Sequence, residues 1–574
     1  MKRKLRLSKG AWIGVFAAAA VIVIVLGVAI ASLFNDGSEG ADVDKAAAAN
    51  SSEDGGNGDS GTLSASANGT LAAISQNDAE EEPEEDDVVS DNEVSENEAD
   101  SVDGVSKNEA VSANAVSDNA TPAEDKPEET TPPVAVAAAP VPASNSSCRL
   151  VDASVVHLSA NFDSAPASED GKLHVYKLAP YQYSLDGAAD IGSIETTASA
   201  AADVAMGDGA VPGLYCKYVF AAIQGGAPVM QGSPQYITNP EILATNTRER
   251  VGYPKKGLTD YFYNWNLDTN NGIPAYIMQI NNYGNSAVLK HPRANQGDSH
   301  MVDEGPLQYM FNASNADGVN ALANAMKGVA NMAGTQDYII GNEVNVRKWC
   351  YIAYTDWDTY VREYMQGFRV AYNAIKSTNA NARVFICLDQ NWDRNMTNQE
   401  AYWFLDGKDF IDKFNANICA GGNIDWGLAF HPHPVPLTYA KIWDMGAIDP
   451  IYGRMVNSNA MISFQNMSTI TNYMTSGSLR SPSGAVRAMM ASETGISANQ
   501  GAEVQAAALY ASYQACVRNP YVDIMIYSFD DSTGARFTDK AWEVYNNMGG
   551  PNDGEYDAWA KSVIGISDWG ELIR

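Results

Sequence analysis

From about residue 240 onward, short apolar runs alternate with longer amphipathic stretches. Short apolar runs bounded by polar turn residues are typical of buried strands, and apolar positions three or four residues apart are typical of helices. The pattern predicts strands over 275–280, 338–340, 383–388, 426–431, 486–492 and 522–529. It predicts helices over 317–333, 358–377, 461–474 and 503–519, and another that includes 410–415. This β-α-β-α order, with roughly eight strands, predicts an α/β fold of the (β/α)8 TIM-barrel type over 237–574.

Before this region the pattern is different. Short β-prone runs at 151–158, 173–178 and 214–223 are separated by turn signals such as Asp170-Gly171, and no helix of convincing length is present. We therefore expect a small all-β, sandwich-like domain over 148–236. Such a domain either contacts carbohydrate or packs against the barrel, and the lack of an evident aromatic platform favours packing.

The N-terminus combines a basic segment, 1–10, with a chargeless apolar run over 11–34. The run is about long enough to cross a bilayer as a helix, and the basic residues before it favour export of the remainder of the chain. It is either an uncleaved transmembrane signal anchor or a signal peptide cleaved after Ala29-Ile30-Ala31. In both cases we expect an extracellular protein, either anchored at the cell surface or secreted.

Residues 35–147 are poor in aromatic side chains and carry much of the formal net charge of −33. Between Glu80 and Glu129 there are nineteen Asp or Glu and two Lys, together with a loose Val-Ser-x-Asn repeat. Such a segment predicts a disordered linker that holds the folded part away from the membrane. The acidity also argues against a nucleic-acid partner, because phosphate binding needs basic patches.

The six cysteines show no Cys-x-x-Cys pairing, so the sequence does not predict a zinc or redox motif. An exported location permits disulfides, with Cys148 and Cys216 inside one domain, but buried free thiols remain the alternative.

Polar residues follow several of the predicted barrel strands. Because a parallel barrel brings the C-terminal ends of its strands onto one face, these residues are expected to share one site. The candidates are Glu343 and Glu493 for catalysis, and for substrate binding Asn342, Asn391, Trp392, His431, His433, Tyr527 and Asp530.

Glu343 and Glu493 are the candidate catalytic pair. A carboxyl beside an apolar strand end is partly desolvated, which would raise its pKa and let it donate a proton near neutral pH. Two facing carboxyls are what a retaining glycosidase needs: one attacks the anomeric carbon and the other exchanges protons. The alternative for Glu343 is an ion pair with Arg347 or Lys348.

The remaining candidates each have a structural alternative. His431 and His433 have a metal-ligand spacing, but the carboxylates that would complete a metal site are assigned to sugar chemistry, so no metal is expected. His431 either contacts sugar or hydrogen-bonds near the nucleophile, or it is structural. Trp392 and Tyr527 either stack on sugar rings or pack at the rim. Asp530 is expected to support substrate binding rather than catalysis. Asp389 is expected to contact other residues of the site rather than to catalyse.

Gly341-Asn342-Glu343 and Ser492-Glu493-Thr494-Gly495 resemble the acid/base and nucleophile strands of the clan-A glycoside hydrolases. A closer likeness is to a bacterial family of extracellular proteins of unknown function, with Tyr-Ile-Thr-Asn-Pro-Glu at 236–241, Ile-Gly-Asn-Glu-Val-Asn at 340–345 and a later His-Pro segment. The resemblance implies that Glu343 is the acid/base, that Glu493 is the nucleophile, and that Asn342 donates to the sugar 2-hydroxyl.

The sequence therefore predicts an extracellular glycoside hydrolase that acts on a poly- or oligosaccharide by a retaining double displacement, without a cofactor. The alternative is a surface carbohydrate-binding or adhesion protein on a barrel that does not catalyse. A third hypothesis is a metal-dependent hydrolase that uses His431 and His433. The membrane is a partner if the N-terminal helix is not cleaved.

Overall fold

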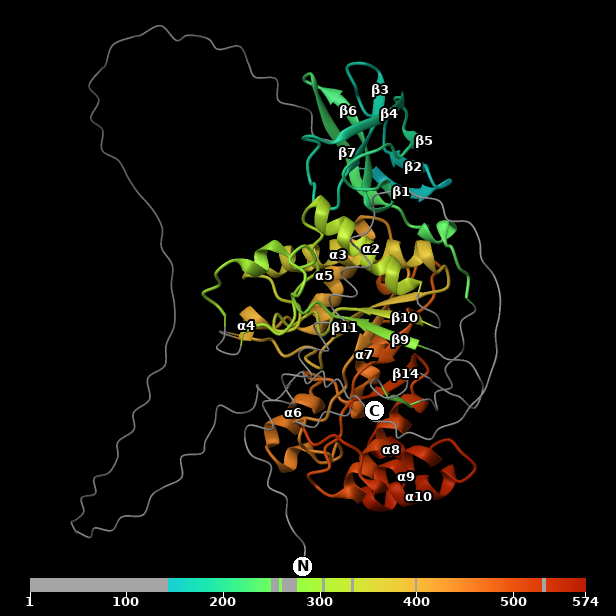
Figure 1. Cartoon of the computed structure of the whole chain (residues 1–574). Helices are drawn as coiled ribbons and strands as arrows, with labels where there is room; N and C mark the ends of the chain where they lie inside the picture. The colour runs from blue at the N-terminus through green and yellow to red at the C-terminus, as the bar shows by residue number, and fades with distance from the viewer. Residues whose placement is uncertain are drawn as a thin grey trace, which may run out of the picture. The chain divides into compact units, whose positions relative to one another are not determined.

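The computed structural model describes residues 143–248, 258–260, 276–301, 305–331, 335–397, 400–528 and 533–574 (Figure 1). These residues form an antiparallel β part followed by a parallel α/β part. None of the helices in the described ranges is long and apolar enough to cross a membrane. The predicted membrane segment at 11–34 and most of the predicted linker at 35–147 lie outside the described residues.

The β part consists of two antiparallel sheets. The first has the order β1-β2-β5, with β1 (Ala143–Leu150), β2 (Val155–Phe162) and β5 (Ser199–Ala205). The second has the order β4-β3-β6-β7, with β4 (Ala189–Glu195), β3 (Lys172–Leu178), β6 (Lys217–Gln224) and β7 (Ala227–Tyr236). Exposed and buried residues alternate along β5, as expected for a strand with one face on a core. Gly192 of β4 lies directly against Val204 of β5, so the two sheets pack on each other as a sandwich.

The α/β part is built on a seven-stranded sheet in which every pair is parallel. Its spatial order is β8 (Leu258–Asp260), β14 (Val522–Tyr527), β13 (Met489–Ala491), β12 (Trp426–Phe430), β11 (Arg383–Leu388), β10 (Thr335–Ile340) and β9 (Tyr276–Ile280). The earliest strand, β8, therefore pairs with the last, β14. Residues 261–275, between β8 and β9, lie outside the described residues, so closure into an eight-stranded barrel stays a prediction.

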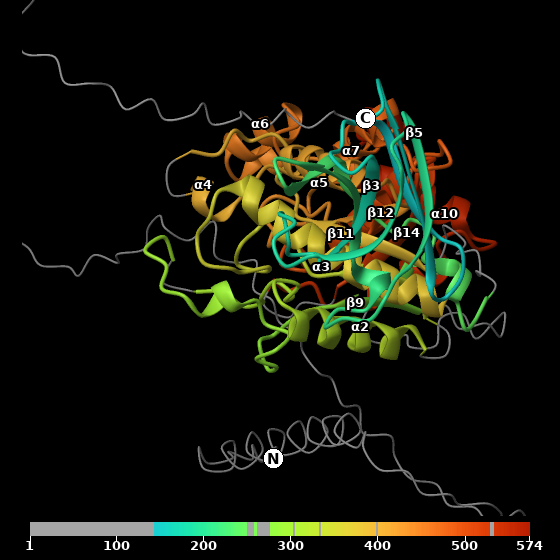
Figure 2. The same ribbon diagram turned by 90° about the horizontal axis from the view of Figure 1, so that it is seen from above.

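Helices connect successive strands and cover the outer face of the sheet (Figures 1 and 2). The long ones are α2 (Ala316–Ala330), α3 (Trp357–Thr378), α5 (Gly407–Ala420) and α8 (Ala502–Arg518). The shorter ones are α4 (Glu400–Trp403), α6 (Pro450–Asn457), α7 (Ser468–Tyr473), α9 (Asp539–Asn547) and α10 (Asp553–Ile564). Alternate strand residues such as Tyr338 and Ile340 join the helices in one core. The intervening residues form a separate core on the inner face: Ile339, Phe385, Cys387, Ala429, Met490, Ile524 and Ile526.

The sandwich is fixed to the outer helices by backbone and side-chain contacts. The amide of Tyr236 donates to the carbonyl oxygen of Gly421 after α5 at 2.8 Å. Asn373 of α3 donates to the carbonyl oxygen of Leu214 at 2.8 Å. The guanidinium of Arg369 lies 5.1 Å from the centre of the Tyr236 ring. These contacts are consistent with a sandwich that packs against the next part of the chain, as the sequence favours.

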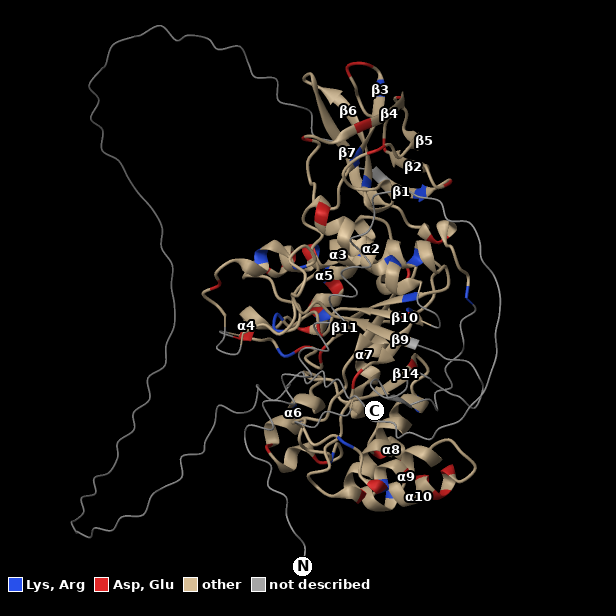
Figure 3. Ribbon diagram, viewed as in Figure 1, with Lys and Arg blue, Asp and Glu red and all other residues tan. Residues whose placement is uncertain are grey.

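Three features differ from the sequence-based expectation or settle an alternative. Strand β1 begins at Ala143, inside the segment expected to be linker, because it finds a partner in β2. The single helix expected over 461–474 is a 3-10 turn at Phe464–Asn466 followed by the short α7, because Ser463 and Asn466 form a capping box within it. All six cysteines are free thiols, and five of them are buried. Figure 3 shows acidic residues along the ribbon of both the sandwich and the α/β part.

Candidate active site

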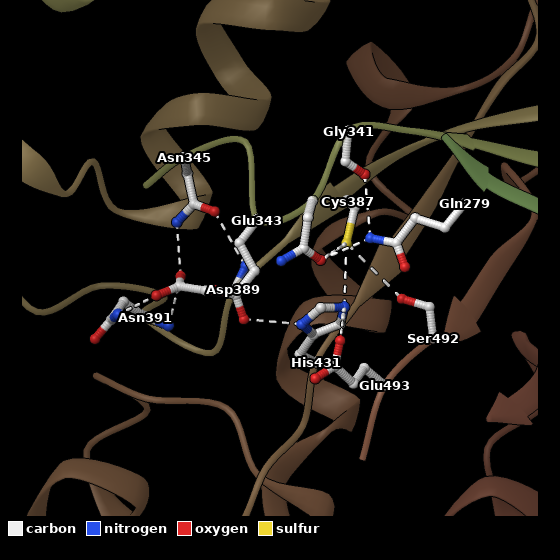
Figure 4. A network of polar contacts seen from close by, with 11 residues as sticks. Gln279, Gly341, Glu343, Asn345, Cys387, Asp389, Asn391, His431, Ser492 and Glu493 are labelled. Atoms are coloured by element: carbon white, nitrogen blue, oxygen red, sulfur yellow. Dashed lines mark hydrogen bonds and ion pairs between the residues drawn. The ribbon is translucent and has the colours of Figure 1, made fainter. Parts of the chain in front are cut away.

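The candidate site lies just beyond the C-terminal ends of adjacent strands β10 to β13. Inner-face positions recur every second residue, so Cys387 of β11 is followed over the same face by Asp389. His431 occupies the corresponding position directly after β12. Figure 4 shows these side chains meeting those of Glu343 and Glu493. The predicted convergence at one end of the sheet is therefore present in the structure.

Glu343 follows β10 in an unusual backbone conformation. Its φ is +39°, and Gly341 two residues earlier has a φ of +84°. A positive φ is costly for a residue with a side chain and clusters at functional sites. The side chain is only 1% exposed, and Oε1 accepts a hydrogen bond from Nδ1 of His431 at 2.8 Å. Oε2 is buried without a hydrogen-bond partner among the described residues. Arg347, one expected ion-pair partner, instead donates to backbone carbonyl oxygens of its own loop.

His431 is the centre of the polar network. Its Nε2 lies 3.2 Å from the sulfur of Cys387 and 3.9 Å from Oε2 of Glu493. Complete burial alone would lower the pKa of His431, but Cys387, Glu493 and Glu343 together outweigh burial and raise that pKa well above its usual range. An imidazolium here can donate from both ring nitrogens, one toward each carboxylate.

Glu493 lies two residues past β13, and its side chain is 29% exposed, in contrast to Glu343. Both carboxylates contact opposite nitrogens of the same imidazole. Although about 150 residues separate them in the sequence, they are therefore no further apart than one histidine ring and two polar contacts. The more exposed carboxylate is the one that a ligand entering from solvent would meet first.

Asn342 is held by a neighbouring strand. Its Oδ1 accepts a hydrogen bond from Nε2 of Gln279 in β9 at 2.6 Å. No described residue accepts from its Nδ2, although the residue is only 8% exposed. Gln279 thus fixes which end of the amide points away from β9. The free end is a donor, which is the role that the resemblance assigns to Asn342.

Asp389 is a second buried carboxyl beside Glu343. It accepts hydrogen bonds from Nδ2 of Asn345 at 2.6 Å and from the amide of Asn391 at 3.0 Å. Burial, and then the negative charge of Glu343, raise the pKa of Asp389 to about 7, against the opposing effect of these donors. The side chain of Asn391 also donates to Asp389 and accepts from Arg394. Asn391, expected to bind substrate, therefore hydrogen-bonds to Asp389 instead.

His433 is buried two residues beyond His431. Neither of its ring nitrogens has a hydrogen-bond partner among the described residues. Burial, reinforced by the charge of His431, lowers the pKa of His433 well below its usual range, so the ring is neutral. One donor atom each from Glu343, His431 and His433 lie within 4.8 Å of one another, as the ligands of a metal ion would. From the sequence alone, the carboxylates that would complete a metal site are assigned to sugar chemistry. In the structure, Glu343 lies beside both histidines.

Two expected sugar-stacking residues lie in the interior instead. Trp392 is 4% exposed and packs edge-to-face on Tyr473 at 5.3 Å. Tyr527 is 1% exposed, and its hydroxyl donates to backbone carbonyl oxygens, including that of Ile496 at 3.0 Å. A ring covered on its faces by protein cannot stack on a sugar, so both belong to the packing, which was the alternative. Asp530 lies outside the described residues.

Sequence reasoning missed two members of the network, Gln279 and Cys387, and one support, Asn345. The period of two would have placed Cys387 beneath the site, since it lies two residues before Asp389. Nothing in the sequence singles out Gln279. Arg248 lies away from the site, since it donates to the backbone carbonyl oxygen of Thr335 at the opposite end of β10.

The model of a family of unknown function (DUF5722) matches residues 245–572, which include all of the site residues described above. No curated protein matches the chain.

Two solved structures of glycoside hydrolases are similar to this chain. A family 39 glycoside hydrolase from Bacteroides cellulosilyticus WH2 is 12% identical, with 68% of this chain and 78% of that chain covered, at a TM-score of 0.27. A β-glucuronidase from an uncultured Clostridium species is 9% identical, with 70% and 68% covered, at a TM-score of 0.24.

Proposed function

The chain belongs to the family of unknown function DUF5722, and we propose that it is a glycoside hydrolase acting on a poly- or oligosaccharide by a retaining double displacement. The observation that carries the proposal is the convergence of Glu343 and Glu493 on the two nitrogens of His431. Two carboxyl groups from separate strand ends, held close together by one imidazole, are the minimal machinery for hydrolysis of a glycosidic bond.

In the first step the carboxylate of Glu493 attacks the anomeric carbon and forms a glycosyl ester. Glu343, which shares a proton with Nδ1 of His431, gives this proton to the leaving oxygen as the glycosidic bond breaks. In the second step Glu343 takes a proton from water, which attacks the anomeric carbon and releases Glu493. The difference in exposure supports this division of roles, because the nucleophile must be open to the sugar and Glu493 is the more open carboxyl.

Three neighbours assist without reacting. The free Nδ2 of Asn342, oriented by Gln279, is a donor for a sugar hydroxyl beside the anomeric centre. His431 is a positioning residue, since it holds both carboxylates and compensates their charge. His433 offers two unused nitrogens to further hydroxyls of the substrate. A fold closed as a (β/α)8 barrel would place all of these groups around one mouth.

The burial of Glu343 sets a condition on the mechanism. Among the described residues, Oε2 is the oxygen of this carboxyl that has no partner, and it is buried, so the glycosidic oxygen reaches it only if the site opens when substrate binds. Catalytic contacts commonly form only in the substrate complex. The same burial favours the second candidate function, a surface protein that binds carbohydrate without cleaving it, because a permanently enclosed Glu343 could not act as an acid.

We also propose that the protein works outside the cell, tethered by the apolar segment at 11–34 and held away from the membrane by the acidic linker. Protease treatment of intact cells should then release the folded part. If the folded part stays with intact cells and is released only when they are lysed, the proposed location is wrong.

The central test is replacement of Glu493 by Ala. With an activated aryl glycoside, the variant should lose activity by several orders of magnitude, and azide should restore part of it by taking the place of the missing carboxylate. Glu503 provides a matched control, because it is a carboxylate in the next helix whose Oε2 binds the indole of Trp559 at 3.0 Å. Glu503→Ala should keep full activity, and full activity in Glu493→Ala would overturn the assignment.

A glycan array with the wild-type protein separates the two candidate functions. Binding together with product release supports the hydrolase. Binding to an array glycan that is not cleaved, over incubations long enough for a slow enzyme to turn over, would favour the carbohydrate-binding protein.

A further inference from the structure

The group of Glu343, His431 and His433 has the composition of a metal centre. Two imidazoles and one carboxylate are a donor set of catalytic zinc sites, which keep a further position open. The three ligand atoms lie within 4.8 Å of one another, close enough for a single ion to contact them all, and all three residues are buried. They come from two strand ends, after β10 and after β12, which are held by the sheet.

Unsatisfied atoms point independently to a ligand at this place. Both ring nitrogens of His433 and Oε2 of Glu343 are buried without a hydrogen-bond partner among the described residues. A buried polar group without a partner costs on the order of 1–3 kcal/mol, more for a charged one, so three such atoms in one cluster call for something that binds them. A cation that prefers imidazole and carboxylate would satisfy atoms of both residues at once.

We propose that Glu343, His431 and His433 bind a divalent transition-metal ion, with Zn²⁺ as the type case, and that this ion inhibits hydrolysis. Binding releases the proton shared by Nδ1 of His431 and Oε1 of Glu343 to solvent, and the carboxylate becomes a metal ligand. A metal-bound Glu343 has no proton to give to a leaving group. The binding stands on the geometry alone, whereas the inhibition rests on the proposed function.

The binding is tested on the full-length protein by titration with Zn²⁺ and by the visible spectrum of the Co²⁺ complex. Excess Mg²⁺ is included, because the acidic linker offers oxygen ligands, which suit Mg²⁺ and not imidazole-preferring metals. One Zn²⁺ should bind in the presence of Mg²⁺, and Co²⁺ should give the intense absorption of a four- or five-coordinate nitrogen-containing site. Loss of all Zn²⁺ binding in Mg²⁺, or a weak octahedral Co²⁺ spectrum, would overturn the site without recourse to any variant.

Variants localise the ion. His433→Ala should weaken Zn²⁺ binding by more than the roughly 10–100-fold that loss of an outer-shell partner costs. His174 is the matched control, because it contacts Asp170 at 2.8 Å and Asp190 at 2.7 Å on the partly exposed face of the sandwich, outside the site. His174→Ala should bind Zn²⁺ as the wild type does. Equal binding by folded His433→Ala and wild type would refute the assignment.

Activity assays distinguish a failure of this inference from a failure of the proposed function. Glu493→Gln should be inactive and still bind Zn²⁺; if it is active but binds Zn²⁺, the hydrolase assignment fails and the metal site stands. In the wild type, Zn²⁺ should suppress turnover and a chelator should restore it. Activity that is lost on chelation and regained with Zn²⁺ would refute inhibition and make the ion part of the reaction.

Discussion

Replacement of Asp389 by Asn should change how the stability of the protein depends on pH. The buried Asp389 has a pKa of about 7, raised by burial and by the negative charge of Glu343. In an unfolded chain the same group titrates near 3.9. Because the folded-state pKa is the higher one, the stabilising contribution is fully present below about pH 4 and is lost as the pH rises through about 7.

The size of the effect comes from this difference. Three pH units correspond to roughly 4 kcal/mol of unfolding free energy, which is an upper figure because Asp389 and Glu343 titrate as a pair. The wild type should lose up to this amount between about pH 4 and about pH 8 relative to Asp389→Asn, which cannot ionise. Urea denaturation followed by tryptophan fluorescence at intervals across this range measures the difference.

Asp298 gives a control with the opposite sign. Its side chain is 3% exposed, but backbone amides of His300 and Tyr354 and the hydroxyl of Tyr351 donate to it. Burial would raise the pKa of Asp298, yet these hydrogen bonds outweigh it and lower that pKa. Its contribution is therefore present above the unfolded pKa and lost as the pH falls. If Asp389→Asn follows the wild type at every pH, or changes in the same direction as Asp298→Asn, the electrostatic reasoning is wrong.

Other expected outcomes concern catalysis and the opposite end of the sheet. His431→Asn should lower kcat by roughly 10²–10⁴-fold with little change in KM, because in the proposed mechanism His431 positions both carboxylates. The control variant His291→Asn, outside the site, should keep the kcat of the wild type. A loss confined to KM would contradict the positioning role of His431. Proton NMR of the first released sugar should show the anomeric configuration of the substrate, and inversion would mean that the two carboxyls act across a water molecule. Arg383→Met should destabilise the protein by roughly 3–5 kcal/mol in urea, because it leaves the fully buried Asp337 without the guanidinium that now lies 2.8 Å away. The exposed ion pair of Lys408 and Asp393 provides the comparison, because Lys408→Met should lower the free energy of unfolding by less than about 1 kcal/mol. Equal losses in the two variants would show that the burial of Asp337 does not matter.

The sequence predicted most of the α/β part because its elements are strongly patterned. The helix expected over 358–377 is α3, Trp357–Thr378, and the strand expected over 383–388 is β11 itself. The strand expected over 486–492 shortens to Met489–Ala491, and the side chain of Arg487 before it binds the backbone carbonyl oxygens of Leu479 and Ile424. Periodicity therefore located this strand but not its first residue.

The site was predictable in its carboxylates and less so in its partners. Glu343 and Glu493 stand out because each comes after an apolar run, and His431 does so for the same reason. The enclosure of Tyr527 depends on contacts with distant residues such as Ile496, which no local pattern encodes. Asn391, in contrast, pairs with Asp389 only two residues away, so this contact was open to local reasoning. An aromatic or amide residue at a strand end can face either the pocket or the packing, and only the fold decides.

The regular alternation along β11 and β12 has a consequence for how this family can diversify. Replacing one side chain of the inner face changes a single group of the site, and the altered chain can still fold. Inserting or deleting a single residue within either strand turns His431 or Asp389 toward the helices and brings an apolar neighbour into the pocket. Members of the family should therefore vary freely in the length of the segments after the strands. The number of residues within each strand should stay the same.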